Sequence, residues 1–112
     1  MPITRALLSK VDAFRHLGAE DLAAIEARLA VESVARGEAL LRQGEPAKDL
    51  YIVASGRFHV WREGEPEPIA EIGAGSPIGE IGFFAGGVRT ATALAERDSL
   101  VLLLSRQDFD DI

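Results

Sequence analysis

A glycine-rich segment over residues 73–95 holds the residue types best suited to bind a charged ligand. Six of the eleven glycines in the chain fall in it, and glycine allows the backbone to approach a ligand closely and to adopt positive φ angles. After Gly79 and Glu80, the sequence Ile-Gly-Phe-Phe is long enough for one helical turn. The first N–H groups of such a turn lack internal partners and point outward. The segment therefore predicts an anion site.

Two charged residues of this segment, Glu80 and Arg89, indicate which kind of anion the site would bind. Arg89 is the only basic residue between Arg62 and Arg97, and the fork of a guanidinium matches two phosphate oxygens at once. Thr90 adds a hydroxyl beside it. Glu80 would repel a phosphate, but a carboxylate accepts hydrogen bonds from sugar hydroxyls. The pair predicts a nucleotide site for ribose and phosphate. The alternative that the sequence leaves open is a plain ion pair between Glu80 and Arg89 on a loop.

Motifs for catalysis and for metal binding are missing from the sequence. The chain has no cysteine, which excludes disulfides, thiol catalysis and thiolate zinc sites. Neither a Gly-x-x-x-x-Gly-Lys-Ser/Thr loop nor a Gly-x-Ser-x-Gly elbow occurs. The two histidines, His16 and His59, lie far apart and form no metal-ligand pattern, and we expect His59 on the solvent-facing side of a strand. We therefore expect no catalytic residue and no metal site. An enzymatic domain fused beyond Ile112 is left open.

Length and composition limit the class of protein. The 112 residues are 47% hydrophobic and 27% charged, the balance of one globular domain rather than of a disordered chain. The net charge of −6, with basic residues scattered, offers no basic surface for nucleic acid or for a membrane. No apolar run approaches the ~20 residues of a membrane span. With no cysteine to pair, a reducing compartment such as the cytoplasm is the expected location.

The hydrophobic pattern changes near residue 31. Before it, apolar residues at helical spacing predict helices over about residues 4–12 and 19–29. After it, short apolar segments separated by glycine-rich turns predict antiparallel strands. The fold class is therefore mainly β with flanking α-helices, a jelly-roll barrel. The predicted strands cover residues 31–34, 39–41, 50–54, 58–61, 69–72, 91–95 and 100–104.

The last residues predict the start of another helix. Ser105 and Asp108 have the spacing of a capping box, in which a hydroxyl caps the first turn. The helix would begin near residue 106 and reach the last residue after about two turns, a length that is marginal alone. We expect the chain to be a fragment of a larger protein, with a C-terminal helix cut short. The alternative is a short helix docked on the sheet.

Taken together, these motifs resemble the cyclic nucleotide-binding domains of catabolite-activator-type regulators, kinase regulatory subunits and gated channels. Residues 78–83 (Ile-Gly-Glu-Ile-Gly-Phe) and 88–92 (Val-Arg-Thr-Ala-Thr) look like the two halves of the family's phosphate-binding cassette. The turns at 37–38 and 43–45 and the strand at 50–56 also look like those of the family. The resemblance covers about residues 12–112. It implies one domain with a helical part (1–30), a β-roll or double-stranded β-helix (31–105) and a helix start (106–112).

The resemblance also implies a ligand and roles for particular residues. The ligand would be cyclic AMP or cyclic GMP, and no further cofactor is expected. Glu80 would accept the ribose 2′-hydroxyl, Arg89 would neutralise the phosphate, and Val60 and Ile72 could line the base pocket. The full set of expected ligand-binding residues is Gly79, Glu80, Ile81, Gly82, Arg89, Thr90 and Ala91, with backbone N–H groups serving at the glycines, Ile81 and Ala91.

The function implied is a regulatory sensor that relays nucleotide binding to a fused effector domain. A homo-oligomer is left open. The alternative is a domain of the same fold that binds no nucleotide and serves as a structural or interaction module. Three departures from the family pattern bear on this choice: Gly82 replaces an alanine, Val88 replaces a proline, and two glycines at residues 86–87 loosen the turn. None of them removes a group that contacts phosphate or ribose.

Overall fold

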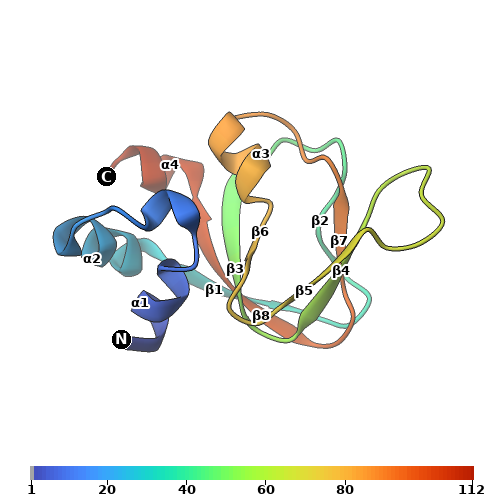
Figure 1. The fold of residues 1–112 in the computed structure, drawn as a ribbon, viewed down its shortest axis with the longest axis horizontal. Coiled ribbons are helices and arrows are strands. Elements are labelled where there is room, and N and C mark those ends of the chain that lie inside the picture. Colours follow the sequence, from blue (N-terminus) through green and yellow to red (C-terminus); the bar gives the residue numbers. More distant parts are fainter. Residues whose placement is uncertain (1) are drawn as a thin grey trace.

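The computed structural model describes residues 2–112, and the side chains from Thr4 onward. Three short helical segments come first (Figure 1), namely α1 (Pro2–Leu8), the 3₁₀ turn η1 (Asp12–Phe14) and α2 (Ala19–Arg28). The prediction of one helix over residues 4–12 is therefore wrong in its extent. The backbone tightens after Leu8, because the N–H groups of Lys10 and Val11 donate to carbonyls three residues back instead of four.

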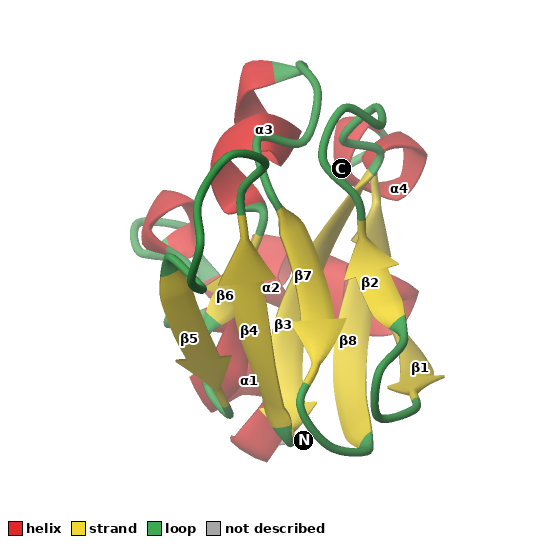
Figure 2. Cartoon of the chain, turned by 90° about the vertical axis from the view of Figure 1, so that its right-hand side faces the viewer, coloured by secondary structure: helices red, strands yellow, loops and turns green. Residues whose placement is uncertain are grey.

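Eight strands then form two antiparallel sheets that face each other as a barrel (Figures 1 and 2). One sheet has the order β1-β8-β3-β6 and the other β2-β7-β4-β5. This confirms the jelly-roll fold class. The strands are β1 (Ala30–Val34), β2 (Ala39–Leu41), β3 (Asp49–Ser55), β4 (Arg57–Trp61), β5 (Ala70–Gly73), β6 (Pro77–Ile78), β7 (Thr92–Ala95) and β8 (Ser99–Ser105).

The sequence analysis missed β6 altogether. This strand is only two residues long and lies inside the glycine-rich segment, so it has no alternating pattern to detect. It forms because residues 77–78 pair with Tyr51 and Ile52 of β3. The chain then turns directly into helix α3 (Glu80–Ala85), which confirms the helical turn expected after Glu80.

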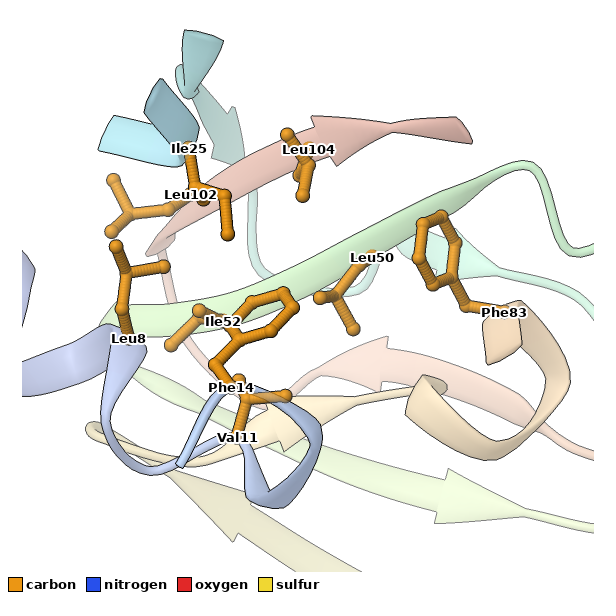
Figure 3. Close-up of a cluster of buried hydrophobic side chains, with 9 residues drawn as sticks. All are labelled: Leu8, Val11, Phe14, Ile25, Leu50, Ile52, Phe83, Leu102 and Leu104. Carbon is orange, nitrogen blue, oxygen red and sulfur yellow. The ribbon is translucent and has the colours of Figure 1, made fainter. Parts of the chain in front are cut away.

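Strand β3 separates two hydrophobic cores. Leu50 and Ile52 face a core shared with the terminal helices, whereas Tyr51 and Val53 face the barrel interior, as the alternation of side chains along a strand requires. The helix-side core draws residues from α1, η1, α2, α3, β3 and β8 (Figure 3). Its buried members are Leu8, Val11, Phe14, Ile25, Leu50, Ile52, Phe83, Leu102 and Leu104.

The final helix α4 (Arg106–Asp110) begins where the capping box predicted. The hydroxyl oxygen of Ser105 accepts a hydrogen bond from the N–H of Asp108 at 3.1 Å, which satisfies one of the N–H groups that the first turn leaves unpaired. The helix lies beside α2 on the helical side of the barrel (Figure 1). In residues 2–112 no helix combines the length and the apolar character that crossing a membrane needs.

The turn at Gly56 yields a test of this fold. Gly56 and Gly64 both have positive φ angles, +100° and +90°, so an alanine at either position costs about 1–2 kcal/mol. A Cβ at Gly56 would also collide with the buried Ser99, whereas Gly64 has open space around it. Such overpacking adds about 1–3 kcal/mol. In urea unfolding, Gly56→Ala should therefore lose clearly more stability than its matched control Gly64→Ala. Equal losses would contradict the packing of the β3–β4 turn against β8.

Candidate functional site

An open cavity of about 250 Å³ lies between α3 and the inner face of the β2-β7-β4-β5 sheet. All seven residues predicted as ligand-binding line it, and so do Val60 and Ile72. The sequence analysis missed Leu41 and Ala93, which complete an apolar wall; their strand patterns alone do not tell which cavity they face. The cavity is lined by Leu41, Val60, Ile72, Pro77, Ile78, Gly79, Glu80, Ile81, Gly82, Arg89, Thr90, Ala91 and Ala93.

Gly79 is the hinge between β6 and α3. It caps the helix in the left-handed region, with φ +73° and ψ 20°, a conformation that glycine adopts without a steric penalty. A Cβ at this position would collide with Nη1 of Arg89. The glycine therefore serves two purposes: it turns the chain into the helix, and it lets the guanidinium approach the backbone. The residues at the start of α3, Gly79–Gly82, line the cavity, and the first N–H groups of a helix lack partners within it.

Arg89 is only 5% exposed although it borders the cavity. Nη1 donates to the carbonyl oxygen of Gly79 at 2.9 Å, and Nη2 donates to the carbonyl oxygen of Asp49 at 2.6 Å. The guanidinium also lies 5.8 Å from the centre of the Tyr51 ring. Burial lowers the pKa of Arg89, but a guanidinium stays charged in proteins. These two bonds engage part of the five N–H donors of the guanidinium.

The alternative of an ion pair between Glu80 and Arg89 is wrong for this structure. The Arg89 guanidinium donates hydrogen bonds to the backbone carbonyls of Gly79 and Asp49, and its charge interacts with Tyr51, Asp49 and Glu45. Glu80 is half-buried at the cavity. Burial raises the pKa of its carboxyl, and the charge of Asp12 raises it further. The two charges therefore border the same cavity as separate groups.

A neighbouring loop fixes the backbone of Arg89. The N–H of Gly44 donates to the carbonyl of Arg89 at 2.8 Å, and the N–H of Arg89 donates to the carbonyl of Glu45 at 2.8 Å. The N–H of Ala47 donates to the carbonyl of Gly87 at 3.0 Å, and Pro46 bridges Val88. These backbone contacts hold residues 87–89 in place. The segment is therefore supported in spite of the two glycines at residues 86–87 and the valine at residue 88.

Gly82 has a packing role that the sequence analysis did not find. A Cβ built there would lie 3.2 Å from Cβ of Ala47 and 3.4 Å from the carbonyl oxygen of Val88. The distance to Ala47 is tighter than ordinary van der Waals contact, and the distance to Val88 is at the short end of it. Glycine in place of the family's alanine thus lets α3 pack close to the loop that carries Arg89, at a cost of about 1 kcal/mol in helix propensity.

Four phenylalanines connect α3 to the terminal helices. Phe83 and Phe84 of α3 lie 5.6 Å from Phe109 of α4, measured between ring centres. Phe14 of η1 lies 6.0 Å from Phe84 and 6.1 Å from Phe109. These separations are in the range of favourable aromatic pairs. Because the partners are up to about a hundred residues apart, no local spacing in the sequence could have revealed this aromatic cluster.

On the outer face of the β2-β7-β4-β5 sheet, the structure brings a histidine and two carboxylates together, a grouping that the sequence analysis did not find. His59 lies beside the carboxylates of Glu71 and Glu96, and the three possible ligand atoms lie within 4.8 Å of one another. His59 is partly exposed, in keeping with its predicted place on the solvent-facing side of a strand. The sequence analysis considered histidines and cysteines alone and overlooked glutamates that the strand pairing brings to His59.

Comparisons with known proteins show which family the chain resembles in sequence and in fold. The sequence model of the family described as "Cyclic nucleotide-binding domain" matches residues 31–112. An uncharacterised NTE family protein of Mycobacterium tuberculosis is 33% identical over 108 residues, 96% of this chain. The cyclic AMP receptor protein of Thermus thermophilus is 34% identical over 77 residues, 66% of this chain. The regulatory domain of Toxoplasma gondii PKA, crystallised with cAMP, superposes with a TM-score of 0.91 at 24% identity, which shows the shared fold.

The chain corresponds to only part of each of these proteins. It spans 18% of the mycobacterial protein and 36% of the Thermus receptor. It covers 43% of the solved Toxoplasma chain, whereas 99% of this chain is matched.

Neutralising Glu80 should stabilise the chain at neutral pH. Because its pKa is raised in the folded state, the folded chain holds more protons than the unfolded chain between the two pKa values. The free energy of unfolding therefore falls as pH rises through that window. Glu80→Gln removes this loss. In urea unfolding, its stability relative to the unmodified chain should therefore grow as pH rises from the ordinary pKa of a glutamate, 4.5, through the raised pKa of the folded chain.

The matched control for this prediction is Glu67→Gln, which neutralises an exposed glutamate in the β4–β5 connection. It should leave the pH profile nearly unchanged. A Glu80→Gln variant that is less stable than the unmodified chain at neutral pH would contradict the assigned burial cost.

Proposed function

The chain belongs to the cyclic nucleotide-binding domain family, and from this premise we propose that it binds cyclic AMP or cyclic GMP in the cavity beside α3. One observation carries the proposal. A buried guanidinium, a half-buried carboxylate and the first turn of a helix border one cavity whose remaining wall is apolar. These are the groups that a phosphate, a ribose and a base need, in a single place.

The phosphate would bind between Arg89 and the start of α3. The guanidinium is already oriented by the carbonyls of Gly79 and Asp49, so little side-chain entropy is lost when a ligand arrives. The N–H groups at Gly79–Gly82 and at Ala91, and the Thr90 hydroxyl, add hydrogen-bond donors. The positive charge and the unpaired helix N–H groups act together on one anion.

The ribose would bind at Glu80. Its raised pKa records that the carboxylate has lost solvation in the free chain, and a 2′-hydroxyl would return one hydrogen bond to it. The base would extend along the apolar wall formed by Leu41, Val60, Ile72 and Ala93. Ile81 stands at the mouth of the cavity and is 80% exposed, so it would be covered in part by the ligand.

The output of binding would be structural rather than chemical. A ligand that draws α3 toward Arg89 would shift Phe83 and Phe84 against Phe14 and Phe109, and would favour one arrangement of the terminal helices. We propose that residues 1–112 act in this way as one non-enzymatic sensor domain for a fused effector. Two observations support this: the chain spans only part of its relatives' length, and the similar Thermus protein is a cyclic AMP receptor protein. The cytoplasm is the proposed location, since the chain has no cysteine.

Calorimetric titration with cyclic AMP and with cyclic GMP tests the proposal. The unmodified chain should bind at least one of them with one site per chain, and the tighter ligand gives the base preference. Arg89→Lys keeps a charge but loses the planar fork, and Glu80→Gln loses the charged acceptor. Because a hydrogen bond to a charged group is worth about 1.5–3 kcal/mol, each change should weaken binding about 10- to 100-fold.

Two matched variants control for general charge effects. Arg97→Lys and Glu67→Gln alter exposed residues outside the cavity and should bind as the unmodified chain does. Glu80→Gln is also expected to fold at least as well as the unmodified chain, so its loss of affinity cannot be ascribed to unfolding. No binding of either nucleotide by the folded, unmodified chain would favour a structural or interaction module.

A further inference from the structure

The outer face of the barrel wall carries a histidine and two glutamates that converge from three adjacent strands or strand ends. His59 of β4 is directly paired with Glu71 of β5, so both side chains leave the same face of the sheet. Glu96 follows β7, and its N–H donates to the carbonyl of Arg57 at 2.9 Å. His59 pairs with Leu94 of β7. Glu96 lies two residues after Leu94, just past the end of β7, so its side chain leaves on the same face as His59.

The separations of the polar atoms fit a metal ion. Nε2 of His59 lies 2.9 Å from Oε1 of Glu71, with which it shares a hydrogen bond that a metal ion would replace, and 3.4 Å from Oε2 of Glu96. In a tetrahedral zinc site with bonds near 2.0–2.1 Å, neighbouring ligand atoms lie roughly 3.3 Å apart. Small side-chain rotations would therefore bring all three atoms to bonding distance of one ion.

Two of the three residues, His59 and Glu71, stand on paired strands. Phe58, next to His59, is fully buried in the barrel, and Ile72, next to Glu71, lines the cavity on the opposite face. Strand positions with anchored neighbours hold ligands more accurately than loop positions do. The cluster thus differs from a chance group of exposed carboxylates: it contains an imidazole, and its geometry follows from strand register.

Arg57 occupies part of the surroundings in the free chain. Its Nη1 lies 3.6 Å from Oε1 of Glu71, and its Nε lies 3.8 Å from Oε2 of Glu96. These distances are too long for good hydrogen bonds, and its side chain is 41% exposed. Arg57 can therefore swing into solvent when another cation binds between the carboxylates. The carboxylates of Glu71 and Glu96 thus already attract one cationic group, the guanidinium of Arg57.

We propose that His59, Glu71 and Glu96 form a site for a divalent transition-metal ion of the zinc type, with water in the fourth position. Imidazole and carboxylate ligands suit Zn²⁺, and three protein ligands with one water is a common zinc arrangement. The site is separate from the nucleotide cavity, since it lies on the other face of the same strands. It does not depend on the proposed nucleotide binding.

Calorimetric titration of the nucleotide-free chain with zinc chloride, in a buffer that does not bind metals, tests this site. The unmodified chain should bind one equivalent of Zn²⁺. His59→Ala, Glu71→Gln and Glu96→Gln should each weaken the affinity at least tenfold, because each removes one ligand. Arg57→Ala should strengthen it, because the competing guanidinium is gone.

His16→Ala is the matched control, since His16 is an exposed histidine outside the cluster. It should bind zinc as the unmodified chain does. The proposal would be overturned if the unmodified chain bound no zinc, if His59→Ala bound it equally well, or if His16→Ala abolished binding. Circular dichroism spectra of each variant verify the fold, and the conservative glutamine variants keep the test valid if His59→Ala fails to fold.

Discussion

Arg89 places a permanent positive charge where only 5% of the residue is exposed. A buried charge is costly unless hydrogen bonds compensate it, and here two carbonyl groups from distant parts of the chain do so. One belongs to Gly79 at the start of α3 and the other to Asp49 at the start of β3. The guanidinium therefore links the start of α3 to β3. The loop at residues 44–47 in turn holds the backbone of Arg89. Most of the site geometry follows from this one requirement.

The same requirement explains the unusual residues around it. Gly79 must lack a side chain because Nη1 of Arg89 occupies that space. Gly82 allows α3 to pack close to Ala47, in the loop that holds the backbone of Arg89. Glu80 contributes nothing to this arrangement and loses solvation in it. A group that costs stability in the free chain and faces a cavity is typical of a functional residue.

Much of the fold and of the site could be predicted from local sequence. The strand segments, the turn after Glu80 and the cap at Ser105 depend on short-range patterns, whereas several of the cavity residues were predicted only through the resemblance to the family. Other features depend on contacts that no local pattern encodes. β6 exists only through its pairing with β3, and the carbonyl partner of Arg89 at Asp49 is forty residues away. The grouping of His59 with Glu71 and Glu96 likewise required the register of three strands.

The central claim is that the oriented guanidinium and the start of α3 receive the phosphate of a cyclic nucleotide. Nuclear magnetic resonance tests it most directly, with spectra of the ¹⁵N-labelled chain recorded with and without cyclic AMP and cyclic GMP. The account predicts that the largest shifts occur at the backbone N–H groups of Gly79, Ile81, Gly82 and Ala91 and at the guanidinium of Arg89. Shifts confined to other parts of the chain, or a guanidinium signal that saturating nucleotide leaves unmoved, would contradict it.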